Sequence, residues 1–270
     1  MGNWFKRASR PESPKVDEPN GPLIAALLMK AGGFPFDAFV KLLSSERICG
    51  QRISVTKAKE NIYSFSLDEG FGGFVEIPAP YPWSDLEGPC ATARMWPDHT
   101  PVRSLEAHHA NILITMMKDK MGPVDRRLLL TQIVGMAARY KGVMGVYWPE
   151  GALVHYPPVF SDMAKALTSA EAPPLMLWVD YRIFDNGDGT IGMFTTGMCP
   201  LGLMELEIPR IDMNSGDLLE WGMSLTQYQL QNGQVLKNGD TIGTIDPHEF
   251  HIRYRPSKFG HRRTIMAIEK

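Results

Sequence analysis

Runs of alternating or continuous apolar residues mark the strands that the sequence predicts. In residues 62–67 the apolar side chains of Tyr63, Phe65 and Leu67 alternate with those of Ile62, Ser64 and Ser66, as they do in a strand that buries one face. The run 185–189, Asp-Asn-Gly-Asp-Gly, separates two further strand-like runs, and its Asn-Gly pair favours a hairpin turn because such a turn needs positive φ angles. The predicted strands are residues 23–29, 53–58, 62–67, 73–78, 110–117, 143–148, 175–184, 190–195, 203–208, 250–255 and 264–268.

Apolar residues that recur every three or four positions mark the helices. Pro123 begins the clearest one, whose apolar stripe reaches Ala137 and which is followed by Gly142, a typical residue after a helix end. Ser84 and Ser215 each precede acidic residues and are predicted to cap two further helices, because a serine oxygen can accept a hydrogen bond from the first turn. Shorter helices are predicted over residues 37–43 and 159–167.

These elements predict an α+β fold in which an antiparallel-rich mixed sheet is covered by four or five helices. Residues 1–20 are polar, interrupted by proline and without periodicity, and are predicted to form a disordered leader. Residues 21–270 are predicted to form a single α+β domain. The alternative is two related halves, 21–150 and 151–270, because the order strand, proline, capped acidic helix occurs in each.

Composition excludes several classes of protein. The chain has 270 residues, 44% hydrophobic and 21% charged, which is a globular mixture rather than that of a disordered chain or a coiled coil. Its 28 Lys and Arg face 30 Asp and Glu, for a net charge of −2, so the whole chain is no polycation for nucleic acid. No apolar run near the start approaches the roughly 20 residues that span a bilayer, so we expect no membrane span.

Cysteine usage predicts a reducing, cytoplasmic setting. Cys49, Cys90 and Cys199 are odd in number and widely separated, whereas disulfide frameworks and zinc sites need more thiols or closer ones. Cys199 lies between Gly197 and Gly202, one residue longer than the spacing of a nucleophile elbow. We therefore predict a bend between strands here, rather than a nucleophile.

Histidines and acidic turns offer no metal site by their spacing. His108 and His109 are neighbours next to a predicted strand, where consecutive side chains point to opposite faces. His248 and His251 lack the helical spacing of zinc hydrolases. The Asp-rich turn has Thr196, not Glu, at the twelfth position that a calcium loop requires. The glycine patterns of dinucleotide and phosphate sites do not occur either, so we predict no metal and no cofactor.

Glu205 and Glu207 are the most suggestive acidic residues. They are two apart in a predicted strand, so both carboxylates should lie on one face. One interpretation is the exposed face of a half-solvated strand, either plain or serving as an acidic partner-binding patch. The alternative is a pair of catalytic carboxylates, one with a raised pKa, which together with His109 would make a small hydrolase or transferase.

The C-terminal stretch is the one segment of the sequence with a bias of charge. Arg253 and Arg255 alternate with apolar residues, and no acidic residue occurs from 250 to 268. The pattern is typical of a partner-binding strand or of a sheet edge protected by charge, and the alternative is nucleic-acid binding. Trp83 and Trp148 are candidate aromatic partner-binding residues.

Several motifs together resemble an uncharacterised bacterial family, the domain of unknown function 4261. The resemblance extends from about Leu23 to Ile268 and implies no established reaction. From the cysteine usage and the absence of catalytic motifs, we expect a cytoplasmic, non-enzymatic binding protein, and the resemblance associates it with immunity-type or accessory factors that occlude a bacterial toxin. The resemblance leaves the oligomeric state open. The motifs are Thr195-Thr196-Gly197-Met198, Gly202, Glu205 with Glu207, Pro82 to Leu86, His109, Tyr147-Trp148, Leu177 to Val179, and Asn238 to Gly243.

Overall fold

A computed structural model shows that the chain divides into two compact units. Unit 1 comprises residues 1–19 and 179–270, and unit 2 comprises residues 20–178. The predicted boundary between possible halves, after residue 150, therefore differs from this division. Of the predicted leader, only the short strand β1 (Phe5–Lys6) lies within the described part of the chain. The structure describes residues 5–6, 21–30, 33–97, 102–117, 120–167, 173–243 and 249–270.

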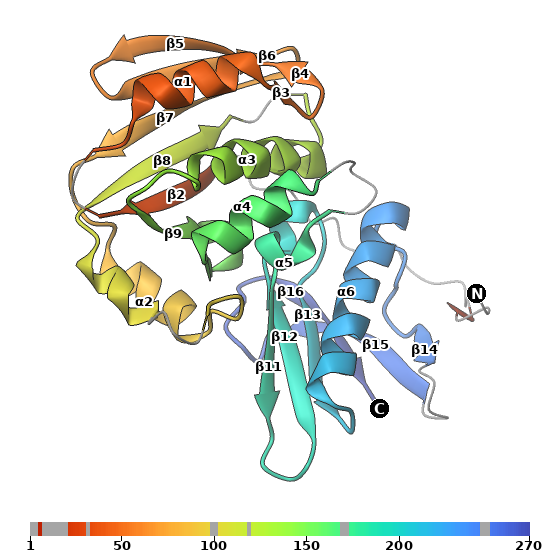
Figure 1. Ribbon diagram of the computed structural model, residues 1–270. Helices are drawn as coiled ribbons and strands as arrows, with labels where there is room; N and C mark the ends of the chain where they lie inside the picture. Colours follow the sequence, from red (N-terminus) through yellow and green to blue (C-terminus); the bar gives the residue numbers. More distant parts are fainter. Residues whose placement is uncertain are drawn as a thin grey trace. The chain divides into compact units, whose positions relative to one another are not determined.

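Unit 2 is built on a seven-stranded antiparallel sheet (Figure 1). The strand order is β10-β9-β2-β8-β7-β6-β5, so the first strand of the unit lies in the middle of the sheet. This position explains its sequence, because a central strand buried on both faces is continuously apolar rather than alternating. The strands are β2 (Leu23–Met29), β5 (Ser54–Lys59), β6 (Ile62–Leu67), β7 (Gly70–Ile77), β8 (Ala110–Met116), β9 (Val143–Trp148) and β10 (Leu153–His155), beside a separate pair, β3 (Arg47–Ile48) and β4 (Gln51–Arg52).

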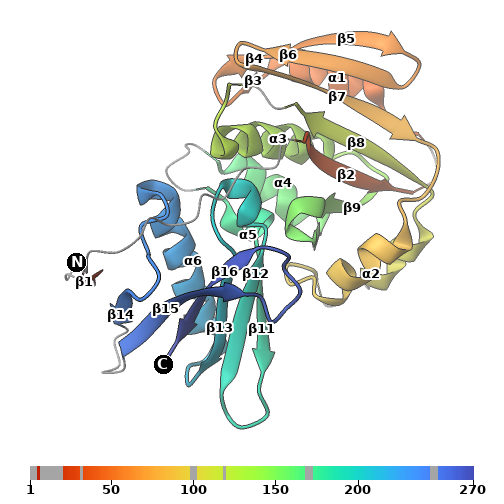
Figure 2. The ribbon, with the colours of Figure 1, turned by 180° about the vertical axis from the view of Figure 1, so that it is seen from behind.

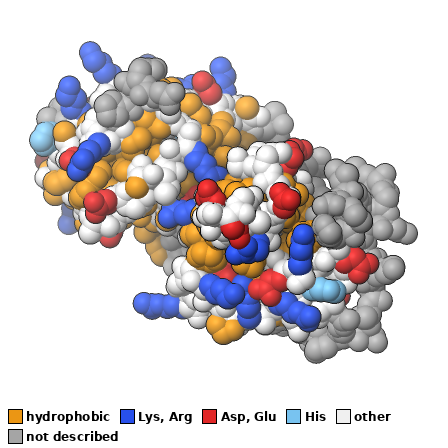
Figure 3. Space-filling view, turned by 90° about the horizontal axis from the view of Figure 1, so that it is seen from below, with side chains coloured by type: hydrophobic (Ala, Val, Ile, Leu, Met, Phe, Trp, Pro, Cys, Tyr) orange, Lys and Arg blue, Asp and Glu red, His pale blue; other side chains and the backbone are white. Residues whose placement is uncertain are grey.

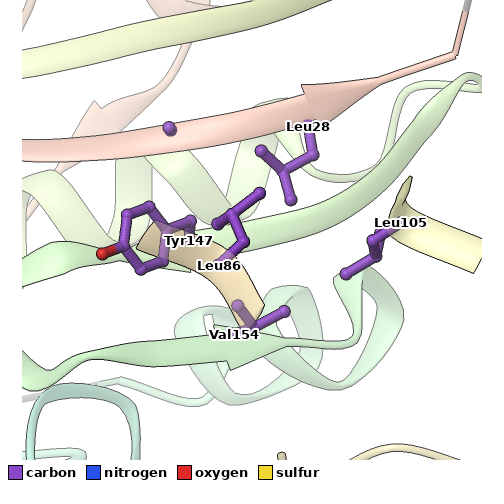
Figure 4. Packing of buried hydrophobic residues seen from close by; sticks show 6 residues of the cluster. Leu28, Leu86, Leu105, Tyr147 and Val154 are labelled. Carbon is purple, nitrogen blue, oxygen red and sulfur yellow. The ribbon is translucent and has the colours of Figure 1, made fainter. Parts of the chain in front are cut away.

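Helices cover both faces of this sheet. On one face lie α1, α3 and α4 (Figure 1). On the other face, Leu86 and Leu105 pack with Leu28, Tyr147 and Val154 in a buried cluster (Figure 4). The helical elements are α1 (Phe36–Ser45), α2 (Trp83–Ala91), the 3-10 helix η1 (Val102–Ala107), α3 (Pro123–Ala137), the 3-10 helix η2 (Pro149–Gly151), α4 (Pro157–Lys165) and α5 (Leu175–Trp178).

Unit 1 is a mixed sheet with one long helix. Its strand order is β1-β14-β15-β16-β13-β12-β11, and only β13 and β16 pair in parallel. The helix α6 (Ser215–Asn232) lies along one face, where Gly222 permits close approach to Met193 and Tyr181. Figure 2 looks onto the sheet from the side away from α6. The strands are β11 (Asp180–Asp185), β12 (Ile191–Thr196), β13 (Leu206–Ile211), β14 (Thr241–Gly243), β15 (Glu249–Pro256) and β16 (Thr264–Glu269).

The predicted α+β class, rich in antiparallel strands, is confirmed. The predicted hairpin at 185–189 is also present, with Gly187 and Gly189 at φ values of 78° and 83°. In each unit a meander of three strands leads to a helix, but β8 then pairs antiparallel with β7 whereas β16 pairs parallel with β13. The two units therefore share the three-stranded meander and the helix after it, but not the pairing of the strand that completes the arrangement.

Two boundaries differ from the predictions for local reasons. The predicted strand 175–184 begins instead with a single helical turn, because Pro173 and Pro174 supply the carbonyls that the first N–H groups of α5 meet. Pro209 does not end β13, which continues to Ile211. Between Ile208 and Ile211, which pair with Met193 and Ile191, β13 contains one residue more than β12, and such a bulge accommodates the proline.

The predicted helix caps are wrong by one or two residues. Asn214, not Ser215, caps α6, with its side-chain oxygen 2.9 Å from the backbone nitrogen of Asp217. Pro82, not Ser84, precedes α2, and no side chain caps that helix. Among the described residues, no helix is both long and apolar enough to cross a bilayer. The surface seen in Figure 3 carries side chains of both charge signs among hydrophobic ones, in keeping with the small net charge.

Candidate functional site

The carboxylate of Glu205 is buried and fully engaged by a tight turn of its own unit. Its Oε1 atom accepts hydrogen bonds from the backbone N–H groups of Gly197, Met198 and Cys199, each at 3.0 Å. Its Oε2 atom accepts a hydrogen bond from the hydroxyl of Thr195 at 2.8 Å. The side chain is only 3% exposed. Glu205 therefore binds the turn as an internal anion.

Glycines give this turn its shape. Gly197 and Gly202 have φ values of 112° and 79°, which side chains other than glycine rarely adopt. Between them lies a short 3-10 helix, η3 (Cys199–Leu201). Successive N–H groups in such a turn form a concave anion site, which Glu205 occupies here. Burial, with the Glu205 charge second, raises the pKa of Cys199 to about 11, so this thiol is protonated at neutral pH.

Glu207 holds the connection between β15 and β16. Its carboxylate lies 2.8 Å from Nη1 of Arg255 and accepts hydrogen bonds from the hydroxyl of Ser257 at 2.6 Å and the N–H of Lys258 at 3.2 Å. Arg255 also reaches Glu269, with 2.9 Å between Nε and Oε1. Glu207 is fully buried. A charge buried in this way is tolerated only when its oxygens are paired and hydrogen-bonded.

The prediction of an exposed acidic face is therefore wrong. Glu205 precedes β13 and Glu207 lies within it, so strand alternation does not relate the two side chains. They share no hydrogen-bond partner among the contacts described above, and neither is accessible to a partner protein. Arg255, also predicted to bind a partner, is instead occupied by two carboxylates of its own chain.

Both carboxylates and all of the partners described for them lie within residues 194–269. Residues 194–269 match the family model for the domain of unknown function DUF4261. The resemblance to this family is confirmed over that segment, which lies wholly within unit 1. No curated protein and no solved structure matches the chain. The geometry explains the glycine and glutamate positions of the DUF4261 segment, because both glutamates hold turns.

The DUF4261 segment also supplies most of a surface in which aromatic rings and cations lie together. Phe194 and Met193 are neighbours in β12 and so point to opposite faces. Because Met193 meets α6, Phe194 lies on the other face, where it stacks on Phe259 with 4.5 Å between ring centroids. Phe184 lies 5.0 Å from Phe259. All three rings are half-buried.

Exposed cations lie on the same face of the sheet as these rings or close to them in the sequence. Residues that are directly opposite each other on paired strands share a face of the sheet. Across the sheet, Arg253 pairs with Ala267, Ala267 with Glu207, and Glu207 with Phe194. Arg253 therefore lies on the same face as Phe194. Lys258 directly precedes Phe259, and both cations are exposed, as is Arg262. We call this the basic aromatic surface, defined by Phe184, Phe194, Phe259, Arg253, Lys258 and Arg262.

The strand β15 that carries Arg253 is not a sheet edge, so the edge-protection interpretation is wrong. It lies between β14 and β16. Beyond β14, the Asn-Gly-Asp turn covers it, because the N–H of Ile252 donates to the carbonyl of Asp240 at 2.8 Å and the N–H of Tyr254 donates to Oδ1 of Asn238 at 2.9 Å. The 238–243 motif of DUF4261 thus completes the sheet.

The two tryptophans singled out from the sequence behave differently. Trp148 is fully buried in unit 2, so the prediction that it is available to a partner is wrong. Trp83 is half-buried and packs against the cluster of Leu28 and Leu86. The apolar surface of both tryptophans stabilises unit 2. The pattern of the sequence could not distinguish such core residues from those of a binding face.

The histidines next to β8 are separated as predicted. His108 is buried and His109 is exposed. The Nε2 atom of His108 accepts the N–H of Tyr81 at 2.7 Å, and its Nδ1 atom lies 2.6 Å from the carbonyl of Leu105, so this ring is structural. His109 lies in unit 2 and the two glutamates in unit 1, and no hydrogen bond joins His109 to either among the described residues.

Among the described residues, no group of three or more His, Cys, Asp or Glu could hold a metal ion. His248, one member of the candidate pair with His251, lies outside the described residues. No pattern in the sequence indicated that Thr195, Ser257 and Phe259 hold or extend the turns around the two glutamates. The glycines at 197 and 202 did predict the bend that forms the first of these turns.

Proposed function

We propose that the protein is a non-enzymatic binding protein that occludes an acidic surface of a partner protein through the basic aromatic surface. The observation that carries this proposal is a cluster of three half-buried phenyl rings on a sheet face that also carries the exposed Arg253, with the exposed Lys258 and Arg262 in the loop of Phe259. Aromatic rings and arginines are the residues that most often dominate the binding energy of protein interfaces.

The basic aromatic surface is preorganised, which favours binding. Glu207 fixes the loop at Ser257 and Lys258, and the N–H of Phe259 donates to the Ser257 hydroxyl at 2.9 Å. The phenyl ring of Phe259 is thereby held on Phe194. Little side-chain entropy then remains to be lost on association.

The engaged state of the reactive groups supports a binding role over the hydrolase alternative. The carboxylate of Glu205 already accepts hydrogen bonds at both oxygens. Burial raises the pKa of Cys49, Cys90 and Cys199 to about 11, and thiols act as nucleophiles only when ionised. The family resemblance then suggests the partner: a toxin, for which this chain would be a cytoplasmic immunity-type factor in a bacterium.

Co-expression with the product of the adjacent gene tests this proposal. We expect the full chain to restore growth of cells that express that product and to copurify with it. The double reversal Arg253→Glu with Lys258→Glu should abolish both effects, because it places like charges against an acidic partner. Lys59→Glu, which changes an exposed cation of β5, is the matched control and should retain both.

Other outcomes would redirect or end the proposal. Protection and copurification that survive the double reversal would exclude the basic aromatic surface as the interface. Absence of both with the unaltered chain would contradict the immunity-type role. Salt-sensitive retention of the full chain by single-stranded DNA or RNA, lost in the double reversal, would instead favour the nucleic-acid alternative, in which rings stack on bases and cations meet phosphates.

A further inference from the structure

A pocket of about 330 Å³ lies in unit 2, among α1, the β3–β4 pair, α3 and α4. It is formed within the one unit and is independent of the function proposed above. Its charged lining consists of Arg47, Arg139 and Lys165 with a single carboxylate, Glu46. Its volume is at the lower end of the range of about 300–1,000 Å³ that small-molecule sites occupy.

The guanidinium of Arg139 is held in place from one side. Its Nε–H group donates to the hydroxyl of Ser161 at 2.9 Å, and that hydroxyl donates to the carbonyl of Gly135 at 2.9 Å. Ser161 is buried, at 3% exposure. A buried serine anchored to helix α3 thus fixes the Nε end of the side chain, and among the described residues no hydrogen bond occupies its Nη groups.

The single carboxylate of the pocket forms no ion pair with its cations. Arg47 donates from Nη1 to the carbonyl of Gly50 at 2.9 Å, within its own hairpin. Among the described residues, no ion pair within 4 Å joins Glu46 to Arg47, Arg139 or Lys165. The pocket therefore collects three positive charges against one negative charge.

Helix ends explain how two of these cations, Arg139 and Lys165, persist together without a carboxylate partner in the described part of the chain. Arg139 follows the end of α3, and Lys165 is the last residue of α4. The carbonyl groups at a helix C-terminus carry partial negative charge and stabilise nearby cations. Their partial charges are smaller than the full charges of the side chains, so the pocket as a whole still attracts anions.

We propose that this pocket binds a small molecule that carries one phosphate or carboxylate group on an apolar body. Arginine N–H groups match the oxygens of either anion. Leu42, Ile48 and Met136 are the large apolar side chains of the lining and would contact the apolar part. Ligands of this class bury their apolar body and are oriented by a few polar contacts.

Calorimetric titration of the full chain tests the site with three probes of one shape: phenyl phosphate, benzoate and phenol. We expect saturable binding of at least one of the two anions with a Kd of about 1 mM or below, and no binding of phenol. The anion that binds more tightly assigns the head group. Arg139→Gln should weaken that binding about tenfold, since it removes a charge-assisted hydrogen bond.

Two further variants keep the test decisive. Lys165→Gln should also weaken binding, and Lys59→Gln, an exposed cation of β5 away from the pocket lining, should leave it unchanged. All three altered side chains are exposed, so we expect unchanged thermal unfolding. Failure of both anions to bind at about 10 mM, equal binding of phenol, or affinity unaffected by Arg139→Gln and Lys165→Gln would overturn the proposal.

Discussion

At the scale of residues, replacing the Glu205 carboxylate by a carboxamide tests whether this buried anion stabilises the turn that it binds. In Glu205→Gln the negative charge is lost and one oxygen becomes an NH2 group, which cannot accept a hydrogen bond from Thr195 or from the turn at 197–199. Because buried donors are then left without an acceptor, we expect the free energy of unfolding to fall by about 3 kcal/mol. Urea denaturation followed by circular dichroism measures the change.

The control for this substitution is Glu220→Gln, which makes the same chemical change on the exposed surface of α6. It should alter the free energy of unfolding by no more than about 0.5 kcal/mol. Equal effects of the two substitutions would mean that the hydrogen bonds around Glu205 contribute nothing measurable to stability.

His155 should make stability depend on pH. Burial lowers its pKa to about 4, although its hydrogen bond to the Leu177 carbonyl opposes the shift. The unfolded chain, with the ordinary histidine pKa of about 6.5, binds the proton at higher pH than the folded chain does. The stabilisation is therefore complete above about pH 6.5 and is lost as the pH falls toward 4.

Between pH 7.5 and pH 5.0 this group should reduce the free energy of unfolding by about 2 kcal/mol. Urea denaturation at the two pH values measures the loss in the unaltered chain and in His155→Gln, which has no titratable group at this position. A variant that loses as much stability as the unaltered chain would show that other groups cause the dependence.

Residue spacing predicted which side chains matter more reliably than it predicted their surroundings. Glu205 and Glu207 were singled out from the sequence, yet their burial depends on residues that no local pattern connects to them. Arg255 and Ser257 reach Glu207 from about 50 positions away along the chain. A two-residue spacing carries no information about such a segment, so the carboxylates appeared exposed.

At the scale of elements, the crossing of α3 and α4 depends on one missing methyl group. A Cβ atom added to Gly135 would overlap the Cβ atom of Ala164, while its next neighbours lie 3.8 Å away. We expect Gly135→Ala to force the helices apart and lower the free energy of unfolding by about 2 kcal/mol, despite the better helix propensity of alanine. Thermal unfolding followed by circular dichroism measures it.

Exchanging the two residues should restore the crossing. In the double variant Gly135→Ala with Ala164→Gly, the methyl group moves from one helix to the other and the overlap disappears. Stability should return to within about 1 kcal/mol of the unaltered chain. Additive losses in the double variant would show that Gly135 is needed for another reason.

Elements with strong local signals were predicted well from the sequence, and those set by tertiary pairing were not. Pro123 and the Asn-Gly turn determine their own backbone, and α3 and the β11–β12 hairpin follow from them. The bulge that lets β13 continue through Pro209 lies in β13 itself, between Ile208 and Ile211, and is defined only by the pairing of this strand with β12. A sequence window around the proline does not contain the pairing with β12, so the strand end was misplaced.

At the scale of the whole molecule, the order of strands in the sheets could not be predicted from the alternation of apolar and polar residues. The sequence predicted a single sheet-based domain, while the strands form two separate seven-stranded sheets. In unit 2 the first strand is central, and in unit 1 the last strand, β16, lies between β15 and β13. Only the pairing of distant strands separates these sheets, and the DUF4261 match lies entirely within the second.

This division predicts that residues 20–178 fold on their own. They contain a complete seven-stranded sheet, helices on both faces and the buried cluster around Leu28, all from one continuous stretch of chain. A domain is expected to fold alone when its core is closed within its own residues. The isolated fragment should show dispersed amide signals in its NMR spectrum and a cooperative thermal transition.

The substitution Leu28→Ala supplies the control for that fragment. Leu28 is fully buried within unit 2, and its truncation should lower the stability of the fragment by about 3 kcal/mol and by a similar amount the stability of unit 2 in the full chain. Equal losses would show that the same core holds in both settings. A fragment without dispersed signals, or a core substitution that affects only the full chain, would mean that residues 179–270 are required for unit 2 to fold.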